Sequence, residues 1–506
     1  MAAAFALALA LTLPAASLGT SRYPNPPDAY VTLTNGGTVI PLINSGDVFD
    51  GETFEGLPDG LGVVPVGQGK RYVDLYVAFE QSTVPFRNSA DFEDSSVQRA
   101  RLDLKTMDIK KLDEVLPASA GFIRFCSAFM AGPEHGFDNY TFFVNEESND
   151  RLARPLGQAG YTVALDTKTG SYGAIPGMGR HNHENSVVVP GGWDEIAILS
   201  GDDTFNAPSS QMYLYTAASD DAVIADQGSL WAFRVTATES GDLEFATDPF
   251  NGANDYGDMT PDSVWSGEFI EVPPTVADGD QDALENWSNE HNVFQFIRVE
   301  DIAADDQDPR IVYFADTGES RALTDAEWTE LDDRGGTVNR EATGRLHRGL
   351  SQVLNPDGSV KYPADPAGSF GNGRIFKFVM NADDPRVVDE FSILHDADTV
   401  AADGTTKMRN PDNIDTSANS LMVQEDASNA KVWQYDFESE SWSIVASVND
   451  PSGESSGIID MSKWLGAGWW ALDVQAHGTN VDSETIGGVT YKREDGQLLL
   501  MQIPGS

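Results

Sequence analysis

The chain has 506 residues and carries 80 acidic against 32 basic side chains, a formal net charge of −48. This negative charge opposes binding to nucleic acid or to anionic lipid and favours cations. Two compatible interpretations of the charge stay open: the solvated acidic surface of a secreted protein, and a set of calcium sites. The single cysteine, Cys126, excludes an internal disulfide. Cys126 is either a small buried apolar residue or a metal-bound thiolate.

The beginning of the chain is typical of a secretory signal. Residues 1–13 are uncharged and rich in Ala and Leu, and residues 14–17 supply the small residues of a cleavage site. No later stretch has the roughly 18 continuous apolar residues that a membrane-spanning helix needs. We therefore expect a signal over residues 1–20 and a secreted or periplasmic mature protein without a membrane span. We take that protein to be a monomer with one domain, residues 21–506.

Short apolar runs dominate the middle of the chain, and each is closed by Gly, Asp, Asn or Pro. Examples are residues 140–144, 161–165, 195–199 and 311–314. Long amphipathic helices are scarce, and residues 96–116 are the best helix candidate near the start. Short strands at regular spacing predict an all-β fold that closes on itself or radiates from an axis.

A strand motif with two aromatic residues two positions apart occurs three times. Its members lie on one strand face, where they would pack sheet against sheet. They are Trp231 and Phe233, Phe376 and Phe378, and Trp433 and Tyr435. The uneven spacing of the motif suits a β-propeller with insertions, and we expect six blades around a central metal site.

Two segments rich in Asp, Gly and Pro interrupt this pattern near residues 251–282 and 324–368. Neither has a hydrophobic run long enough to build a core of its own, although residues 326–333 are a candidate short helix. Long loops of this kind commonly cover binding sites. We therefore expect both insertions to be loops that cover the central site.

The strongest chemical signal is the stretch from Gly179 to Glu184, Gly-Arg-His-Asn-His-Glu, which precedes an apolar run. Its imidazoles and carboxylate are metal-ligand types. Similar carboxylate clusters end other candidate strands: Glu146 with Glu147, Glu300 two residues after Arg298, and Asp412 followed later by Glu425. In a propeller such ends converge on the central channel, and a cation is the natural way to hold several carboxylates close together.

Each of these residues also has a purely structural interpretation, and these alternatives stay open. A buried histidine is often only hydrogen-bonded, and adjacent acidic residues often belong to turns or solvated hairpin ends. The residues concerned are His183, Glu184, the pair Asp202 and Asp203, and the pair Glu425 and Asp426. Arg298 either pairs with Glu300 on one strand face or clamps a phosphate with its planar fork.

The ordered motifs together resemble the PhoX-type alkaline phosphatases, a secreted family of calcium- and iron-dependent β-propellers. The resemblance spans about residues 125–477. It is carried by Cys126, by the strand that ends in Glu146 and Glu147, by Gly179-Arg180 with His183-Glu184, by Arg298-Val299-Glu300, by Pro411-Asp412-Asn413, and by the segment Asp473 to His477. The chain differs from the family pattern at Asn145, at Asp301 and after Cys126.

The resemblance implies a site and an activity. Cys126 and Glu300, with Glu184 or one of the paired glutamates Glu146 and Glu147, would bind iron. Neighbouring carboxylates, among them Asp412 and Glu425, would bind calcium. Arg298 would hold the substrate phosphate, and four residues would support the site: His183, Asn413, Gln475 and His477.

The implied activity is that of a metal-dependent phosphomonoesterase acting on small organic phosphate esters. Two alternatives stay open: a non-catalytic, calcium-binding extracellular β-propeller, and another propeller hydrolase such as a lactonase or phytase. The phosphatase interpretation alone requires Cys126, Glu300 and Arg298 to approach one another.

Overall fold

We describe the protein from a computed structural model of the chain. The structure describes residues 28–504 apart from residues 50, 68–70, 81–92, 149–158, 205–209, 244–255, 319–352, 355–359, 363–370, 400, 403 and 487–488. The expected signal, residues 1–20, and the candidate helix at residues 326–333 lie outside the described residues.

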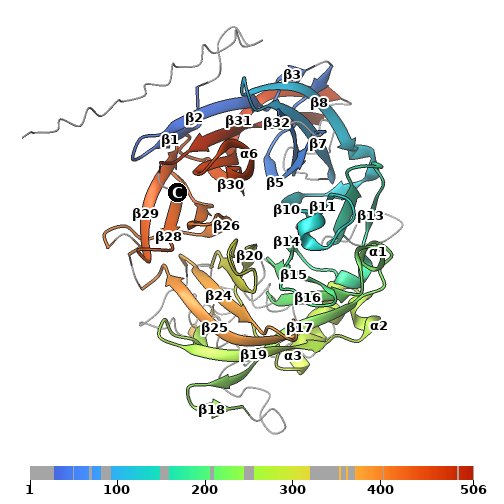
Figure 1. Cartoon of the computed structure of the whole chain (residues 1–506), viewed down its shortest axis with the longest axis vertical. Helices are drawn as coiled ribbons and strands as arrows, with labels where there is room; N and C mark the ends of the chain where they lie inside the picture. Colours follow the sequence, from blue (N-terminus) through green and yellow to red (C-terminus); the bar gives the residue numbers. More distant parts are fainter. Residues whose placement is uncertain are drawn as a thin grey trace, which may run out of the picture.

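Six antiparallel blades surround a central channel in the described part of the chain (Figure 1). The first three blades follow one another in chain order. Blade 1 has β5 (Pro58–Pro65), β6 (Tyr72–Phe79), β7 (Glu93–Asp103) and β8 (Asp108–Leu116). Blade 2 has β10 (Phe125–Ala131), β11 (Thr141–Glu146), β12 (Thr162–Asp166) and β13 (Tyr172–Ala174). Blade 3 has β14 (His183–Val188), β15 (Ile196–Asp202), β16 (Met212–Ala217) and β17 (Ser229–Thr238).

The second half of the chain supplies the other three blades. Blade 4 has β20 (Val299–Ala304), β21 (Ile311–Asp316), β24 (Arg374–Met380) and β25 (Val387–Asp396). Blade 5 has β26 (Pro411–Thr416), β27 (Ser420–Glu425), β28 (Lys431–Asp436) and β29 (Ser441–Val448). Blade 6 has β30 (Glu454–Asp460), β31 (Trp469–Ile486) and β32 (Val489–Gln502).

The innermost strands form a closed ring. Each of β5, β10, β14, β20, β26 and β30 contacts its two neighbours, and β30 contacts β5. The predicted all-β propeller with six blades is therefore confirmed. The division into one domain stays a prediction.

The N-terminal strands close the ring at its outer edge. β2 (Thr38–Asn44) pairs with β32 and completes blade 6, and β1 (Val31–Leu33) pairs with β29 of blade 5. Strand edges that would otherwise be open are thereby paired.

The remaining described elements are short. They are the strands β3 (Val48–Phe49), β4 (Glu52–Thr53), β9 (Phe122–Ile123), β18 (Gly241–Asp242), β22 (Val353–Leu354) and β23 (Val360–Tyr362), the helices α1 (Asp220–Ile224), α2 (Pro274–Ala277), α3 (Gln281–Glu290) and α6 (Ser462–Leu465), and the 3₁₀ turns η1 (Ala118–Ala120), η2 (Pro133–His135), η3 (Pro176–Met178) and η4 (Tyr256–Asp258). No helix in the described ranges is long and apolar enough to cross a membrane.

The expectation of a helix over residues 96–116 is wrong, because this segment forms the β7–β8 hairpin. As a helix, this segment would have had only a narrow apolar face, because positive and negative side chains are mixed along it. In the hairpin these charges pair across the two strands. Arg99 contacts Asp113 of the partner strand at 2.7 Å. Leu102 and Leu112 are buried in the core.

The expectation of a loop over residues 251–282 is also wrong in part. Val264–Glu271 forms β19, which pairs with β17 and with β25 and so joins blades 3 and 4 into one sheet. The strand alternates along its length, with Trp265 and Phe269 buried and Val264 exposed. Of the second expected insertion, only the β22–β23 hairpin lies within the described residues.

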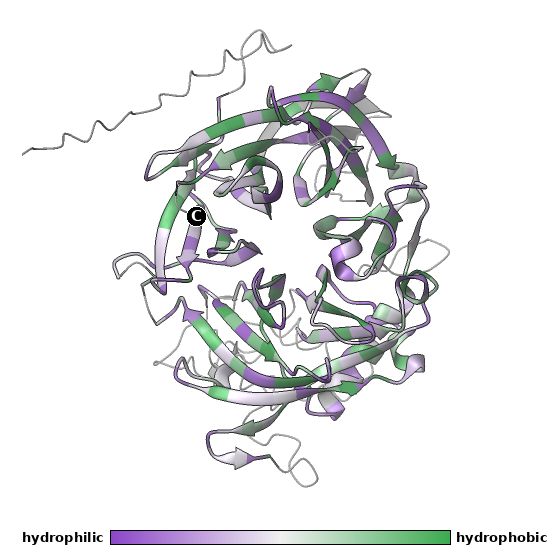
Figure 2. Cartoon of the chain, viewed as in Figure 1, coloured by the Kyte–Doolittle hydropathy of each residue, from purple (hydrophilic) through white to green (hydrophobic). Residues whose placement is uncertain are grey.

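Aromatic packing holds these two blades together, and hydrophobic residues alternate with polar ones along the strands (Figure 2). Phe391 of β25 lies at the centre of this packing. Its ring centroid is 5.2 Å from that of Phe233, 5.1 Å from that of Phe294 and 5.2 Å from that of Phe378. Phe233 of blade 3 and Phe378 of blade 4 pack between the two blades, which β19 joins into one sheet; packing of the aromatic motif between separate sheets stays a prediction.

We expect Phe391→Ala to lower the free energy of unfolding by about 3–5 kcal/mol, because the cavity left in this cluster cannot collapse fully. Denaturant unfolding would measure the change. Val264→Ala is the matched control on the neighbouring strand; its side chain is 57% exposed, so a change within about 0.5 kcal/mol is expected. Equal losses in both variants would contradict this account of the core.

Candidate metal centre

Every inner strand carries an irregularity shortly after it begins. The pairing register with the second strand of the blade shifts between Pro58 and Leu61, Phe125 and Ala128, His183 and Ser186, Val299 and Ile302, Pro411 and Ile414, and Ser456 and Ile458. Such bulges bend a strand and re-aim its side chains, and they are common next to active sites. Here they occur in all six blades and at the same end of the channel.

The residue just inside each bulge bears a ligand-type side chain in five blades. It is the second residue of its inner strand: Asp59, Cys126, Glu184, Glu300 or Asp412. In the sixth blade Glu454 opens β30. The chain thus repeats one device around the channel, although the residue types differ from blade to blade.

In four blades the second strand of the hairpin adds an acidic residue beside it. In blades 1 to 5 the first residue of the inner strand pairs with the last residue of the next strand, as Phe125 pairs with Glu146. The residue after that pair is Glu80 in blade 1, Glu147 in blade 2, Asp203 in blade 3 and Asp426 in blade 5. Blades 1, 2, 3 and 5 therefore place two ligand-type residues at the start of the channel.

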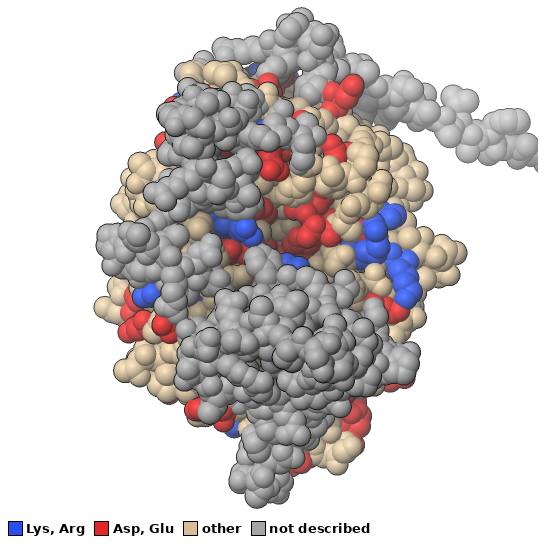
Figure 3. All heavy atoms as spheres, turned by 180° about the vertical axis from the view of Figure 1, so that it is seen from behind, with Lys and Arg blue, Asp and Glu red and all other residues tan. Residues whose placement is uncertain are grey.

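These positions bring seven residues into a row. Three groups have ligand atoms that all lie within 4.8 Å of one another: Asp59 with Glu80 and Cys126, Cys126 with Glu147 and Glu184, and Glu184 with Glu300 and Asp412. Cys126 and Glu184 each belong to two groups, so the groups are continuous. Acidic side chains gather in the hollow on the corresponding face of the molecule (Figure 3).

Burial gives this row unusual acid–base properties. It raises the pKa of Asp59 to about 7, with a further contribution from Glu80. Burial also raises the pKa of Glu147 to about 8, against the lowering effect of Arg124. The pKa of the Cys126 thiol is raised well above its usual range by burial and by the surrounding carboxylates. Without a cation these groups therefore keep their protons to higher pH than ordinary carboxyl and thiol groups do.

Unsatisfied oxygen atoms also indicate a ligand. Among the described residues, Asp59 Oδ1, Glu184 Oε1 and Asp412 Oδ1 are buried and have no hydrogen-bond partner. A buried carboxylate oxygen without a partner is costly unless it binds a cation or a proton. Carboxylates suit hard cations, and a thiolate adds affinity for a transition metal. The residues present therefore fit a metal centre.

Two of the four expected supporting residues contact this row or lie just beside it. Gln475 Nε2 donates to Asp59 Oδ2 at 3.0 Å and to Glu80 Oε1 at 2.9 Å, which fixes both carboxylates. His477 Nε2 lies 3.4 Å from Glu454 Oε1. Hydrogen bonds to Glu454 and Glu494 outweigh burial and raise the pKa of His477 to about 11, so the ring is cationic.

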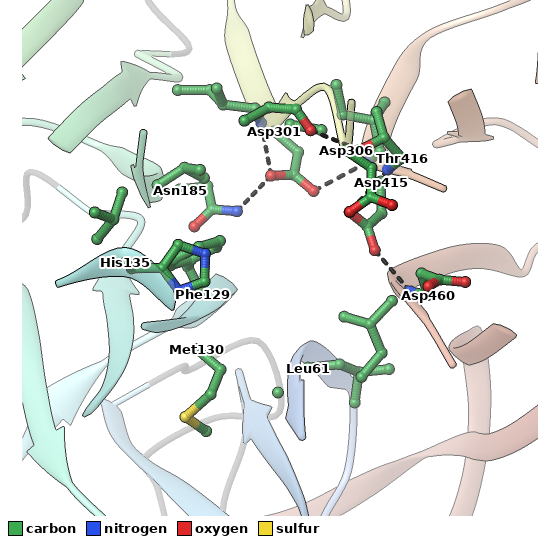
Figure 4. A pocket seen from close by; sticks show the side chains of 18 of the residues that line it. Leu61, Phe129, Met130, His135, Asn185, Asp301, Asp306, Asp415, Thr416 and Asp460 are labelled. Carbon is green, nitrogen blue, oxygen red and sulfur yellow. Dashed lines mark hydrogen bonds between the residues drawn. The ribbon is translucent and has the colours of Figure 1, made fainter. Parts of the chain in front are cut away.

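Asn413, the third supporting residue, belongs to a set of polar side chains next to the row. Hydrogen bonds among these side chains link the inner strands of different blades. Asn413 Nδ2 donates to Ser127 Oγ at 2.8 Å. Asp301 accepts hydrogen bonds from Asn185 Nδ2 and, at 3.0 Å, from the backbone N–H of Ile414 (Figure 4). Asp301 therefore joins three blades, which gives a structural role to one position where the chain differs from the family pattern.

His183 is a buried, hydrogen-bonded histidine, the structural role that the sequence left open for it. Its Nδ1 lies 2.8 Å from Ser200 Oγ and its Nε2 lies 3.1 Å from the Gly179 carbonyl oxygen. Burial lowers its pKa to about 4, so the ring is neutral. The motif around residue 184 supplies one ligand-type residue, Glu184, on a strand that His183 anchors.

Glu146 and Glu425 were expected to bind metal, but the structure gives them another role. Glu146 Oε1 accepts from the backbone N–H of Ile123 at 2.8 Å, and Glu425 Oε1 accepts from that of Arg409 at 3.0 Å. Each donor is two residues before an inner strand. These carboxylates tie the incoming chain to the blade. Successive strand residues point to opposite faces, so the next residue, Glu147 or Asp426, faces the channel.

Arg298 lies beside the row and not only against its strand neighbour. Its Nε donates to Asp203 Oδ1 at 2.7 Å and its Nη2 to Asp203 Oδ2 at 2.6 Å. Nη2 also lies 3.4 Å from Glu300 Oε1. Glu300 and Cys126 both have ligand atoms within 4.8 Å of a ligand atom of Glu184, so Glu184 lies between the cysteine and the Arg298–Glu300 pair; the convergence of all three residues stays a prediction.

A separate cavity of about 400 Å³ lies at the other end of the inner strands. Its lining includes Phe129, Met130, Asp415 and Asp460, which come late in their strands (Figure 4). Asp415 Oδ2 accepts from the backbone N–H of Asp460 at 2.7 Å. Asn185 and Asp301, which directly follow Glu184 and Glu300 of the row in the chain, also line this cavity.

Comparison with known proteins supports the fold. No family model matches the chain, and neither does any curated protein. Among solved structures, PhoX of Pseudomonas fluorescens in complex with vanadate, a transition state analogue, is similar with a TM-score of 0.58. The match covers 93% of this chain and 96% of that one at 13% sequence identity. The chain has a PhoX-like fold.

Two glycoside hydrolases match with lower TM-scores of 0.41. They are an α-L-arabinanase of Penicillium chrysogenum, at 8% identity over 92% of this chain and 98% of that one, and an α-L-arabinofuranosidase of Fusarium graminearum, at 9% identity over 91% and 97%. The PhoX-like fold was expected from the ordered motifs, and that resemblance is confirmed at the level of architecture.

Adjacent glutamates give a direct test of the row. We expect Glu147→Gln to lose bound metal, because an amide oxygen offers no negative charge to the cation. Glu146→Gln, its matched control one residue away, should keep the metal and lose only stability. Metal content per chain, measured by plasma mass spectrometry after gel filtration, distinguishes the two. Equal metal content in both variants would contradict the assignment of Glu147.

The raised pKa values predict a pH dependence for the chelated protein. A carboxyl group whose pKa is higher in the folded state stabilises the fold while protonated, and this contribution is lost as pH rises through the folded value. With folded pKa values of about 7 for Asp59 and about 8 for Glu147, stability should fall from about pH 4, the value in the unfolded chain, up to about pH 8. Buried neutral histidines such as His183 oppose this fall only below about pH 6.5, so it should be clearest between about pH 7 and 8. Thermal unfolding with EDTA measures this, and Glu147→Gln should flatten the curve. A flat wild-type curve would count against it.

Proposed function

We propose that the protein is a metal-dependent phosphomonoesterase that releases phosphate from small organic phosphate esters. The observation that carries the proposal is the position of Arg298, 3.4 Å from Glu300 at one end of a row of buried carboxylates and one thiol. A cation-binding propeller without catalysis would need the carboxylates. It would not need the Arg298 guanidinium that lies between Asp203 and Glu300.

The cofactors we propose are calcium and ferric iron. Cys126 with Glu147 and Glu184 offers a thiolate and two carboxylates, a set suited to iron, and Glu300 lies next in the row. Glu184, Glu300 and Asp412 together offer only carboxylates, which suit calcium. Bound cations would neutralise the phosphate oxygens and lower the pKa of a nucleophilic water.

Arg298 would bind and orient the ester. Its planar fork matches two phosphate oxygens, and a positive charge within a buried site stabilises charge that develops on the transferred group. Glu300 would hold a cation beside it, and Gln475 would keep Asp59 and Glu80 in place. No serine nucleophile is required in this arrangement.

The structural comparison supports the same chemistry. The PhoX structure of similar fold contains vanadate, a transition state analogue, and vanadate mimics a phosphoryl group in transfer. The high negative charge and the signal expected at residues 1–20 support action outside the cytoplasm. We propose that the protein works there as a monomer on small esters.

The first test is hydrolysis of a simple aryl phosphate by the purified protein, together with its metal content. We expect turnover at alkaline pH, loss of turnover with EDTA, and recovery when calcium and iron are returned. A protein that binds calcium and gains stability from it without any turnover would instead support the non-catalytic propeller. Turnover of a lactone or of phytate alone would support the other propeller hydrolases.

A pair of variants separates the two roles at the site. Glu300→Gln should lose metal and activity together. Arg298→Lys should keep the metal, while kcat/KM falls by about ten- to a hundredfold because the bidentate fork is lost. Glu425→Gln, outside the row, is the control and should retain metal and activity. If Arg298→Lys and Glu300→Gln both retain full metal and activity, the pair is only an ion pair on a strand face.

A further inference from the structure

We propose that Asp203 is a positioning residue that fixes the guanidinium of Arg298 for phosphate binding; this rests on the proposed function. From the sequence, a turn was one open interpretation of Asp203, and no partner for it was identified. Asp203 is 95 residues away from Arg298 in the sequence, but the two side chains are in direct contact in the structure.

The contact is a two-point clamp. Each oxygen of Asp203 accepts one N–H group of Arg298, at 2.7 and 2.6 Å. Asp203 is 1% exposed, so water does not compete for these bonds. Two parallel hydrogen bonds fix the plane of a guanidinium and hence the direction of its remaining N–H groups.

The backbone on the Asp203 side of the clamp is itself held. The N–H of Asp203 donates to the carbonyl oxygen of Asn182 at 2.9 Å, and Asn182 Nδ2 donates to the carbonyl oxygen of Asp203 at 3.0 Å. Gly201, two residues earlier, lies against β20: a Cβ there would come within 2.7 Å of the Glu300 carbonyl oxygen. This close approach of the two strands brings Asp203 within reach of Arg298.

The backbone of Arg298 is held as well. Asp316 Oδ2 accepts from the N–H groups of Ile297 at 2.9 Å and of Arg298 at 3.3 Å. Ser210 Oγ accepts from the N–H of Val299 at 3.0 Å and donates to the carbonyl oxygen of Asp202. Both ends of the arginine are therefore fixed to the two strands that meet at the metal row.

Fixing the arginine side chain in advance lowers the conformational entropy that is lost when phosphate binds. A free arginine side chain would have to be ordered by the substrate, and that ordering weakens binding. Held by Asp203, it presents its charge next to Glu300 without rearrangement, which is the arrangement that stabilises developing charge most effectively. Asp203 reaches the substrate only through Arg298, so removing it should weaken phosphate binding and leave the metal in place.

A second buried Arg–Asp pair in the structure serves as the control. Arg374 donates to Asp396 from Nε, at 3.1 Å, and Arg374 is 3% exposed. This pair lies in blade 4, and neither residue belongs to the metal row. Asp396→Asn removes the same kind of charge from the same kind of environment, so it reports the stability cost alone.

The experiment measures competitive inhibition of aryl phosphate hydrolysis by inorganic phosphate in the metal-loaded protein. We expect Asp203→Asn to raise the inhibition constant about tenfold, the effect of losing one charge-assisted hydrogen bond, at unchanged metal content. Asp396→Asn should lower the melting temperature and leave the inhibition constant unchanged. Asp203→Glu, which keeps the charge but displaces it, provides a second variant with the same expected direction if Asp203→Asn does not fold.

A double-mutant cycle separates positioning from a general structural effect. If Asp203 acts through Arg298, Asp203→Asn adds little to the loss already caused by Arg298→Lys. Fully additive losses, or an inhibition constant for Asp203→Asn equal to that of Asp396→Asn, would overturn the inference and leave the phosphatase proposal standing. A wild-type protein that neither hydrolyses the ester nor binds phosphate by calorimetry would overturn both.

Discussion

The structure depends on one electrostatic constraint: buried carboxylates at the start of the inner strands cannot all be ionised next to one another without cations. In the row from Asp59 to Asp412, neighbouring ligand atoms lie within 4.8 Å. Only Arg298 and Arg124 bring positive charge to it directly, as partners of Glu300 and Glu147 among the described residues. Such a site is stable either when it is protonated or when it holds metal. Because the pKa is about 7 for Asp59 and about 8 for Glu147, the protonated state is lost as the pH rises above neutral.

The propeller meets this constraint with a repeated local device. In five blades the inner strand begins, pairs once with its neighbour, and then bulges, so that a side chain turns into the channel; in the sixth the bulge comes after three pairs. The opposing strand ends in a residue that points into the blade, such as Glu146, and the next residue, such as Glu147, faces the channel. Backbone hydrogen bonds to the inward-pointing carboxylates hold the incoming chain. The bulge is a feature of the backbone and does not depend on the side chain at that position. Each blade can therefore supply a different type of ligand residue.

This explains how far the sequence could predict the molecule. Short strands and aromatic pairs were enough for an all-β propeller, because they report local alternation and packing. The helix expected at residues 96–116 failed because charges that disfavour a helical face, such as those of Arg99 and Asp113, are satisfied across strands. For the adjacent acidic residues at strand ends, the sequence showed where the site lies along the chain but not which of the two side chains faces the channel. Glu146 and Glu425 were therefore predicted to bind metal, whereas in the structure they anchor the incoming chain.

The residues that sequence reasoning missed lack a local signature. Asp59 and Glu80 precede the region of resemblance, and Asp203 looked like a turn. A signal existed: Glu80 directly follows an alternating strand, as Glu147 and Asp203 do. This signal can be interpreted only when the pairing register between the innermost and the second strand of each blade is known. The partnership of Asp203 with Arg298 joins two blades, and no spacing in the sequence reports such a contact.

The central claim, that the bulged inner strands assemble one continuous cation site, is tested most directly by anomalous diffraction from crystals of the protein grown with calcium and iron. The account predicts at least two adjacent peaks within the row, one beside Cys126, Glu147 and Glu184 and one beside Glu184, Glu300 and Asp412. A well-ordered crystal structure with no peak in the row, or with peaks only at surface carboxylates, would contradict it.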